Sequence, residues 1–212
     1  MLTLTLQHFN KVTMPDFTIE DSTSGIVAGV DEAGRGPWAG PVVAAAVIVN
    51  RDIFPEGIDD SKKLSAKKRE ELFIKIMGSC GVGIGLSSTK EIDDINILQA
   101  TMLAMQRAVS DLPQIPDMAL IDGNRVPILP CQSQTIIKGD SKSFSIAAAS
   151  IIAKVTRDRI MSELATEFPH YGWEKNSGYG VKQHKEALEE HGVTPHHRKS
   201  FKPIAKLLLC SL

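Results

Sequence analysis

The sequence predicts an α/β fold in which a mixed sheet is flanked by helices. Five short apolar runs, bounded by glycine, proline or acidic residues and mostly rich in β-branched side chains, predict buried strands. They are residues 26–30, 41–49, 80–86, 117–124 and 134–140. The first two runs are close together in the chain, which favours an antiparallel pair. A helical stretch before residue 117 permits a crossover to a parallel strand.

The composition limits the kinds of protein that this chain can be. Its 212 residues suit one large domain, or one domain with an appendage, and a formal net charge of −1 confines any nucleic-acid surface to a local patch. Three widely spaced cysteines favour a reducing compartment over a disulfide framework. The first 24 residues lack the apolar core of a signal peptide, and no run is long enough to span a bilayer. We therefore expect a soluble, cytoplasmic protein that does not contact membranes.

The first strand leads directly into two adjacent acids and a glycine-rich turn. Asp31 and Glu32 follow the apolar run, and Gly34, Arg35 and Gly36 come next. Two carboxylates at the end of a buried strand are costly to ionise without a positive partner, such as a divalent cation. Consecutive strand residues point to opposite faces, so both acids can serve one site only if the strand ends or bends there, as the glycines allow. The alternative is a strand end capped by an Arg35–Glu32 ion pair.

A group of basic residues lies between the second and third predicted strands. Five cations occur in the eight positions from Lys62 to Arg69. Ser65 is a suitable N-cap for a helix that would carry part of this charge on a solvated face. Lys62 and Lys63 precede that helix in a loop, where a phosphate contact forms more easily.

Residues 80–110 predict a strand followed by a helix. Glycine alternates with apolar residues over residues 80–86, so we expect the strand to pack closely through its glycine face. The glycine spacing does not match a dinucleotide-binding loop, which excludes that function. Ser88 begins a pattern typical of a capping box. The helix after it carries an apolar stripe that we expect to face the core, formed by Ile95, Leu98, Met102, Met105 and Val109.

The last two predicted strands repeat the pattern of apolar run, acid and glycine. Asp122 closes the first of them and Asp140 closes the second. Strands that end in acids at three places favour one shared site, because sites in open α/β sheets gather where strand ends meet helix starts.

A long helix is predicted from Ser145 to about Phe168. Its first half is almost entirely apolar, so we expect it to be buried on most sides. Ser150, Lys154 and Arg157 share one face by helical spacing. They form either a charged strip that reaches solvent or a support for the acid cluster, and the sequence leaves both possibilities open.

The chain changes character after Phe168. Five of the six histidines occur there, but no cysteine accompanies them closely and two are adjacent, so the pattern disfavours a zinc site. A glycine turn presents Tyr179, and residues 182–191 predict a helix ended by Gly192. Basic residues outnumber acidic ones seven to four between residues 171 and 206, which favours a nucleic-acid surface.

Four acids are placed at predicted strand ends: Asp31, Glu32, Asp122 and Asp140. Four carboxylates cannot all stay ionised close together without compensation. Two Mg²⁺ or Mn²⁺ ions among them would form a clamp for in-line displacement at phosphorus, and an all-oxygen site favours these metals over zinc or copper. The basic segments would then hold the flanking phosphates.

Taken together, the motifs resemble ribonuclease HII. The resembling segments are residues 29–37, 60–64, 121–124, 138–155 and 196–201, and they occur in order over nearly the whole chain. The resemblance implies a ribonuclease H-like mixed five-stranded sheet flanked by helices, with a C-terminal helical extension. It implies a Mn²⁺- or Mg²⁺-dependent endonuclease that cuts the RNA strand of RNA–DNA hybrids. It also implies cutting on the 5′ side of single ribonucleotides embedded in duplex DNA, by a protein expected to be monomeric.

The resemblance also assigns roles to individual residues. The family's four catalytic, metal-binding acids fall on Asp31, Glu32, Asp122 and Asp140. Its substrate-binding elements fall on Gly34, Arg35, Gly36 and Tyr179, with further contacts expected from Ser61, Lys62, Lys63 and Arg198. Two positions depart from the family pattern: Trp38 replaces a more common aliphatic residue, and Ser177 replaces a lysine, which weakens any phosphate contact at that turn.

These implications predict three parts of the chain. They are a loose polar arm at residues 1–24, a ribonuclease H-like catalytic core at residues 25–168, and a helical, basic substrate-binding extension at residues 169–212 packed on the core. A different metal nuclease on the same fold, such as a junction resolvase or a DEDD exonuclease, is one alternative. A non-catalytic nucleic-acid binding module and a structural metal-binding domain are the others. The glycine–arginine–glycine turn and Tyr179 count against the first alternative, and acids that repel phosphate without a metal count against the second.

Overall fold

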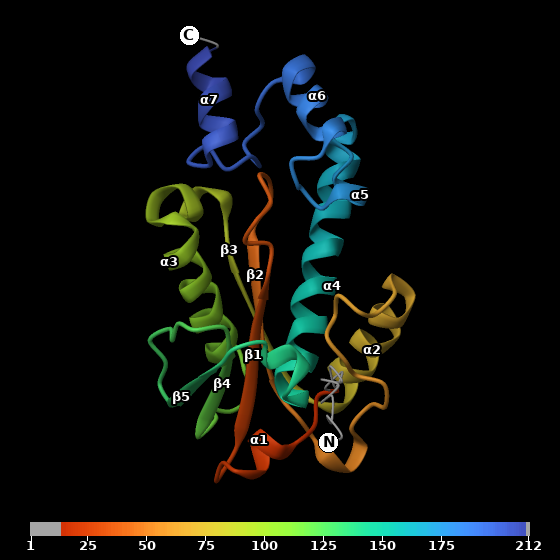
Figure 1. The fold of residues 1–212 in the computed structure, drawn as a ribbon, viewed down its shortest axis with the longest axis vertical. Helices are drawn as coiled ribbons and strands as arrows, with labels where there is room; N and C mark the ends of the chain where they lie inside the picture. The colour runs from red at the N-terminus through yellow and green to blue at the C-terminus, as the bar shows by residue number, and fades with distance from the viewer. Residues whose placement is uncertain (1–13, 211–212) are drawn as a thin grey trace, which may run out of the picture.

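The computed structural model describes residues 14–210 and contains one mixed five-stranded sheet (Figure 1). The strands lie in the order β3-β2-β1-β4-β5. Their bounds are Val27–Ala33 for β1, Val42–Ile48 for β2, Gly81–Ser87 for β3, Met118–Asp122 for β4 and Gln132–Ile136 for β5. β2 pairs antiparallel with β1 and with β3, whereas β4 runs parallel to β1 and to β5. The predicted mixed sheet is therefore confirmed, including the antiparallel start and the parallel crossover.

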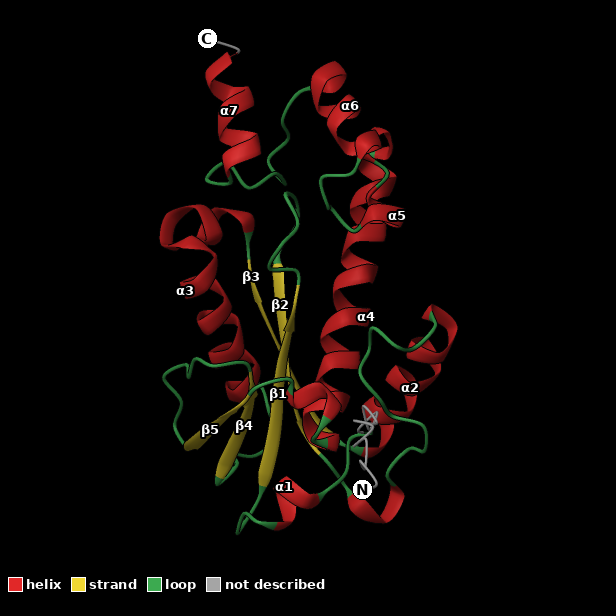
Figure 2. Cartoon of the chain, viewed as in Figure 1, coloured by secondary structure: helices red, strands yellow, loops and turns green. Residues whose placement is uncertain are grey.

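Helices cover both faces of this sheet (Figure 2). α3 (Thr89–Ser110) lies on one face, and α4 (Phe144–Glu167) lies on the other, with α2 (Ala66–Ser79) beside it. Side chains alternate along β1, so that Ala28 and Val30 join the core on the α3 side, while Gly29 faces α4. The same alternation decides where the acids further along β1 point.

Glycine at two places lets the helices lie directly on the strands. A Cβ built at Gly29 would fall 2.1 Å from the backbone carbon of Ser145, in the first turn of α4. At Gly83 and Gly85 it would fall 2.2 and 2.1 Å from backbone oxygens of α3. These approaches confirm the predicted close packing of the glycine face, and Gly29 brings the start of α4 to the strand that carries the first acids.

The local helix signals are confirmed, but the predicted apolar stripe of α3 is partly wrong. Ser65 caps α2, and Ser88 forms a capping box with Glu91 at the start of α3. Asn96, however, has φ 67° and ψ 163°, so α3 is two helices joined at a kink. The kink changes the helical phase, which leaves Ile95 38% exposed although Met105 and Val109 are buried as predicted. The Asn96 side chain accepts hydrogen bonds from the amides of residues 98 and 99, and so caps the second helix.

The C-terminal helices form a separate small core beyond the end of the sheet. They are α5 (Trp173–Asn176), α6 (Lys182–His191) and α7 (Lys202–Cys210), which lie at the top of Figure 1. Trp173, Tyr171 and Leu188 pack there against the last turns of α4. The predicted helix over residues 182–191, ended by Gly192, is confirmed. None of the helices in the described part of the chain has the length and hydropathy that crossing a bilayer requires.

Part of the predicted loose arm is instead docked on the core. Residues 1–13 lie outside the described residues, but α1 (Thr18–Asp21) follows at once. Glu20 is buried and accepts hydrogen bonds from the hydroxyls of Ser143 and Ser145 at the start of α4. Phe17 packs against Phe144 with ring centroids 4.9 Å apart. The expectation of a loose arm is therefore wrong for residues 17–20, because the hydrogen bonds of Glu20 and the packing of Phe17 hold them against the core.

Candidate active site

The predicted acids meet where β1 extends past β4. The β1–β4 pairing ends at Val30 and Ile121, and Asp31 and Asp122 are the next residues of their two strands. β1 itself continues through Ala33, paired with β2. Asp31 and Glu32 therefore lie inside a strand, not after its end as predicted, and alternation sends their side chains to opposite faces.

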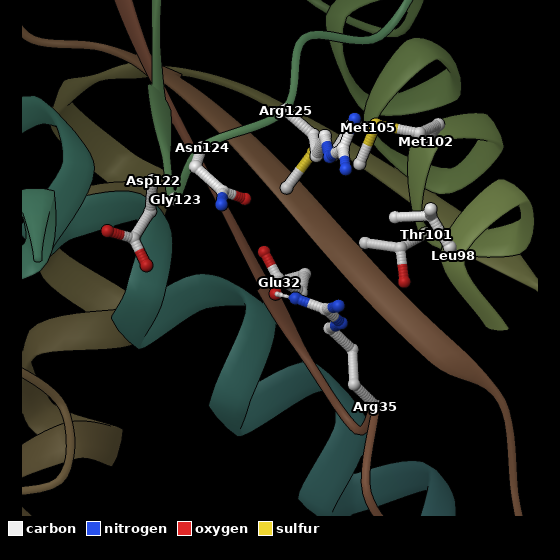
Figure 3. Close-up of a pocket in the computed structure, with 10 residues that line it drawn as sticks. All are labelled: Glu32, Arg35, Leu98, Thr101, Met102, Met105, Asp122, Gly123, Asn124 and Arg125. Carbon is white, nitrogen blue, oxygen red and sulfur yellow. Dashed lines mark hydrogen bonds and ion pairs between the residues drawn. The ribbon is translucent and has the colours of Figure 1, made fainter. Parts of the chain in front are cut away.

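Glu32 faces the α3 side of β1 and lines a cavity there (Figure 3). Met102 and Met105 of α3 lie across this cavity, and Asp122 borders it. The Arg35 guanidinium lies 3.3 Å from the Glu32 carboxylate. The ion pair that the sequence left as an alternative is thus present beside the acid cluster.

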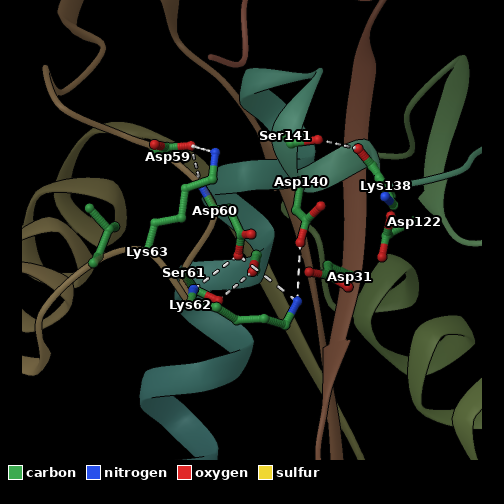
Figure 4. Close-up of polar contacts among 12 residues, drawn as sticks. Asp31, Asp59, Asp60, Ser61, Lys62, Lys63, Asp122, Lys138, Asp140 and Ser141 are labelled. Atoms are coloured by element: carbon green, nitrogen blue, oxygen red, sulfur yellow. Dashed lines mark hydrogen bonds and ion pairs between the residues drawn. The ribbon is translucent and has the colours of Figure 1, made fainter. Parts of the chain in front are cut away.

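Three aspartates form a compact group on the α4 side (Figure 4). One carboxylate oxygen from each of Asp31, Asp122 and Asp140 lies within 4.8 Å of the others. Asp140 does not end a strand, as was predicted; it lies on a short 3-10 helix, Gly139–Ser141, after β5. The Gly139 amide donates to Asp122 over 2.7 Å, which joins this turn to the end of β4. Glu32 is not part of the compact group.

Burial and mutual repulsion disfavour the ionised acids. Burial raises the pKa of Asp31 well above its ordinary value, and the charges of Glu32, Asp122 and Asp140 raise it further. The pKa of Asp122 is also raised, chiefly by burial. Burial raises the pKa of Glu32 as well, although Arg35 opposes the change. Positive charge close by is therefore needed before Asp31, Glu32 and Asp122 all ionise.

The donor set fits a divalent cation. The ligand set consists of carboxylate oxygens, which Mg²⁺ and Mn²⁺ prefer. The raised pKa of Asp31 means that a cation bound nearby would stabilise its ionised form. Within residues 14–210 no other three His, Cys, Asp or Glu side chains approach one another so closely. Asp31, Asp122 and Asp140 would hold the ion, with Glu32 near the edge of the site.

The predicted phosphate-binding loop is only partly directed at the site. The Lys62 ammonium lies 3.2 Å from Asp140, and this hydrogen bond and charge raise the pKa of Lys62 against the opposing effect of burial. Ser61 is buried and shares a 2.7 Å hydrogen bond with Ser150 of α4. Lys63 pairs with Asp59 and points away from the aspartates, so the structure does not bring it into the site (Figure 4).

The glycine–arginine–glycine turn and Tyr179 share one cavity with the acids. Its volume is about 400 Å³, and its lining includes Asp31, Asp122, Lys62, the turn and Tyr179. A Cβ at Gly36 would lie 3.2 Å from the Tyr179 ring, so the turn and the ring are in contact. Tyr179 is 51% exposed, which leaves its ring available to another molecule.

The two departures from the family pattern both support the Tyr179 turn. Trp38 covers Gly180, where a Cβ would fall 2.1 Å from the indole ring, and the Trp38 amide donates to the Gly178 carbonyl. Ser177 has φ 48° and donates a 3.2 Å hydrogen bond to Asp158. The Ser177 side chain therefore faces α4 and is held there by its hydrogen bond to Asp158.

Arg198 was predicted to bind substrate, and the structure contradicts this. Its side chain is fully buried, and it donates to backbone carbonyls of Gly34 and Arg35. Arg157 is also buried and donates to carbonyls, including that of Ser177; it borders the cavity of Asp31 and Asp122 but pairs with neither acid. Lys154 is paired with Asp158. The sequence signals a charge at residues 157 and 198 but not its burial.

The histidines form a hydrogen-bonded chain behind Tyr179. Trp173 donates to Nε2 of His184 and the Thr194 amide donates to Nδ1 of His197, so both these nitrogens are acceptors. His197 Nε2 must then donate to His184 over 3.0 Å, and His184 Nδ1 donates to the Tyr179 carbonyl over 3.0 Å. Both rings are neutral in this arrangement. Sequence reasoning missed this role, because only the fold brings residues 184 and 197 together.

We expect His197 to make the fold sensitive to acid. Burial and the adjacent His184 lower its pKa to about 3 from an ordinary value of 6.5. Below pH 6.5 the unfolded chain takes up this proton and the folded protein does not until about pH 3, so stability is lost as the pH falls through this range. The loss approaches about 1.4 kcal/mol per pH unit.

Urea unfolding at about pH 7 and about pH 5 measures this effect. The His197→Gln variant cannot take up the proton and should lose less free energy of unfolding between the two values than the wild type does. His170→Gln, at an exposed position, is the control. Equal pH dependence in the wild type and His197→Gln would contradict the prediction.

Comparisons with known proteins identify the family of the chain. The profile described as ribonuclease HII matches residues 28–204. The chain is 62% identical over 185 residues to the ribonuclease HII of Magnetococcus marinus, covering 86% of this chain and 87% of that protein. It superposes on the crystal structure of ribonuclease H2 from Pyrococcus horikoshii with a TM-score of 0.72 and 31% identity, over 85% of this chain and 96% of that one. A Bst ribonuclease HIII solved in complex with Mn²⁺ matches the fold alone, with a TM-score of 0.71 and 21% identity over 88% of this chain and 70% of that one.

The family profile spans most of the sequence, and the four acids and the glycine–arginine–glycine turn lie within the matched residues. The identity to the Magnetococcus marinus protein extends over nearly the same length. The chain belongs to the ribonuclease HII family of nucleases.

Proposed function

We propose that this protein is an endoribonuclease that hydrolyses the RNA strand of RNA–DNA hybrids and cuts on the 5′ side of single ribonucleotides embedded in duplex DNA. Family membership supports the first activity. The second is supported by the shared cavity, in which Asp31 and Asp122 lie beside two elements suited to contact a sugar: the Gly34–Gly36 turn and Tyr179. The names of the relatives favour this function over that of a junction resolvase, a DEDD exonuclease or a non-catalytic module.

Mn²⁺ or Mg²⁺ is the proposed cofactor, held by Asp31, Asp122 and Asp140. The Mn²⁺ in the solved ribonuclease HIII, a protein of the same fold, supports this choice. When bound, such ions lower the pKa of a nucleophilic water and stabilise the charge on the leaving oxygen.

The chain's own side chains orient the site and attract the substrate. The Glu32 amide donates to Asp31 over 2.7 Å and the Gly139 amide donates to Asp122, which fixes the direction of both carboxylates. The Arg35 side chain is 52% exposed, so it can leave Glu32 for a phosphate of the nucleic acid. Lys62, whose side chain is 76% exposed, adds positive charge at the opposite edge of the aspartate group.

Recognition of the ribose depends on a close backbone approach. The 2′-hydroxyl is the difference between ribose and deoxyribose, and it both donates and accepts hydrogen bonds. Gly36 has no side chain to keep a sugar away from the turn, and Tyr179 borders it. A site built to bind a hydroxyl rejects a sugar that lacks it, because its own polar groups are left unpaired.

A cytoplasmic location and a monomeric state remain predictions from the sequence.

The proposal predicts a defined reaction. Purified protein with Mn²⁺ or Mg²⁺ should cut a DNA duplex that contains one ribonucleotide on the 5′ side of that ribonucleotide, leaving a 3′-hydroxyl and a 5′-phosphate. The products follow from attack by water instead of the substrate's 2′-hydroxyl. Matched all-DNA and all-RNA duplexes and an RNA–DNA hybrid are the comparison substrates, and gel analysis with end-labelled strands identifies the products. Full activity in excess chelator, or a cyclic phosphate product, would exclude this mechanism.

A further inference from the structure

Two buried arginines lie directly beneath the turns that border the substrate cavity. Arg198 is fully buried and donates from Nε to Gly40 and from Nη1 to Arg35, each over 2.9 Å, and from Nη2 to Gly34 and Pro41. Every one of these acceptors is a backbone carbonyl. One side chain thus joins both sides of the loop that follows β1.

Arg157 of α4 joins the same loop to the Tyr179 turn. It is 2% exposed and donates to the carbonyls of Ala39 and Pro41, each over 3.0 Å, and of Ser177 over 2.9 Å. A Cβ built at Gly34 would lie 1.9 Å from Arg157 Nε, so the turn rests directly on this guanidinium. Gly34 has φ +95°, which also favours glycine there.

Neither guanidinium has a carboxylate partner within ion-pair distance among the described residues. A buried charge without a directly paired carboxylate is costly; here the two cations also oppose each other, and the more distant charges of Asp158 and Asp93 offset this only in part. Burial lowers the pKa of Arg157 to about 10 and that of Arg198 to about 9. Apolar residues of similar volume would fill this space at lower cost, so the arrangement points to a function in orienting the backbone.

The geometry of the peptide unit shows what is oriented. No peptide bond in residues 14–210 is cis, and in a trans unit the C=O and the following N–H point in opposite directions. The carbonyls of Gly34 and Arg35 point inward to Arg198, so the amides of Arg35 and Gly36 point outward, on the side of the cavity that the turn lines. Neither amide donates to any group of the described chain. Two adjacent free amides that point to the same side are suited to bind a phosphate or hydroxyl oxygen.

We propose that Arg157 and Arg198 are positioning residues for ribose recognition. They hold the Gly34–Gly36 turn and the Ser177–Tyr179 turn in one arrangement, with the amides of Arg35 and Gly36 directed at the sugar–phosphate backbone of the substrate. Their positive charges polarise the carbonyls that they bind and so strengthen the outward amides as donors. This inference rests on the proposed function, since it assumes that these turns contact the ribose.

Replacement of Arg198 with chemical rescue tests the inference. Arg198→Ala should lower kcat/KM on the singly substituted duplex by roughly a hundredfold, as expected when the loss of an orienting group misplaces a site by about 1 Å. Millimolar methylguanidinium should occupy the space left by the side chain and restore at least part of this loss, whereas the same concentration of urea should not. Mn²⁺ affinity should stay close to the wild-type value, because no aspartate of the group contacts Arg198. Arg198→Lys, which keeps a buried cation but cannot span four carbonyls, should be impaired in the same direction.

Controls separate positioning from a general effect on folding. Arg159→Ala removes an exposed arginine of α4 that pairs with Glu70, and it should change neither the rate nor the response to methylguanidinium. Wild-type rates in Arg198→Ala and Arg198→Lys would overturn the inference, as would a loss that methylguanidinium cannot restore in either variant. Failure of the proposed function would appear differently, as a wild-type enzyme that does not prefer the singly substituted duplex over matched DNA.

Discussion

Asp31→Asn should abolish turnover and at the same time stabilise the metal-free protein. The substitution keeps the volume of the side chain but removes a charge from the compact aspartate group. Losses of roughly a hundredfold or more in rate are typical when a metal ligand or its orientation is lost. Asp122→Asn and Asp140→Asn should lower the rate in the same direction.

The gain in stability follows from the raised pKa of Asp31. A carboxyl whose pKa is higher in the folded state favours folding below its ordinary value of 3.8, and this advantage is lost as the pH rises through the folded pKa. At neutral pH the wild-type, metal-free protein therefore carries an unfavourable group that the asparagine variant lacks. A gain of about 1 kcal/mol would raise the thermal midpoint by roughly 2–4 °C for a protein of this size.

Thermal unfolding in chelator measures the stability of the metal-free protein, and thermal unfolding in Mn²⁺ measures the stability gained from binding the metal. In chelator the variant should unfold at the higher temperature, whereas in Mn²⁺ the wild type should gain stability and the variant should not. Asp52→Asn, at an exposed position, is the matched control and should change neither the midpoint nor the rate. A variant that cuts at the wild-type rate in saturating Mn²⁺ would place Asp31 outside the reaction.

The parts of the fold that local chemistry determines were predictable. Glycine-bounded apolar runs located the strands, Ser65 and Ser88 marked helix starts, and Gly192 marked a helix end. The acids were predicted to share a site because sites in open α/β sheets gather where strand ends meet helix starts, and Asp31 and Asp122 do follow the last paired residues of β1 and β4.

The parts that depend on tertiary context were not predictable. The sequence does not show that pairing with β2 continues the strand β1 beyond Asp31 and Glu32. Because both acids lie inside the strand, Glu32 faces the side of the sheet opposite to Asp31. It does not show the kink at Asn96, because asparagine is compatible with a helix interior and with a cap. A basic motif near the C-terminus predicts a solvated cation, so only the folded chain shows that Arg198 is enclosed by carbonyls.

Tyr179 should matter more for an embedded ribonucleotide than for a continuous hybrid. Its ring contacts Gly36, so a sugar that approaches the outward amides of the turn must also meet the ring. Stacking of a base on an aromatic side chain is worth about 1–3 kcal/mol, which corresponds to roughly fivefold to more than a hundredfold. In a continuous hybrid several riboses are available to the enzyme, whereas in a DNA duplex one junction must be placed correctly.

Comparison with Lys62 isolates this effect. Tyr179→Ala should slow cleavage of the singly substituted duplex much more than Lys62→Ala does, and it should lower the ratio of rates on the duplex and the hybrid. Lys62 lies 3.2 Å from Asp140 and supplies charge to both substrates, so Lys62→Ala should slow both alike. Tyr179→Phe keeps the ring and removes the hydroxyl, so a rate between those of the wild type and Tyr179→Ala would divide the effect between stacking and hydrogen bonding. Single-turnover rates on both substrates provide the measurement. If Tyr179→Ala slowed neither substrate, the tyrosine would be an ordinary surface aromatic residue, and recognition of the ribose would belong to the Gly34–Gly36 turn alone.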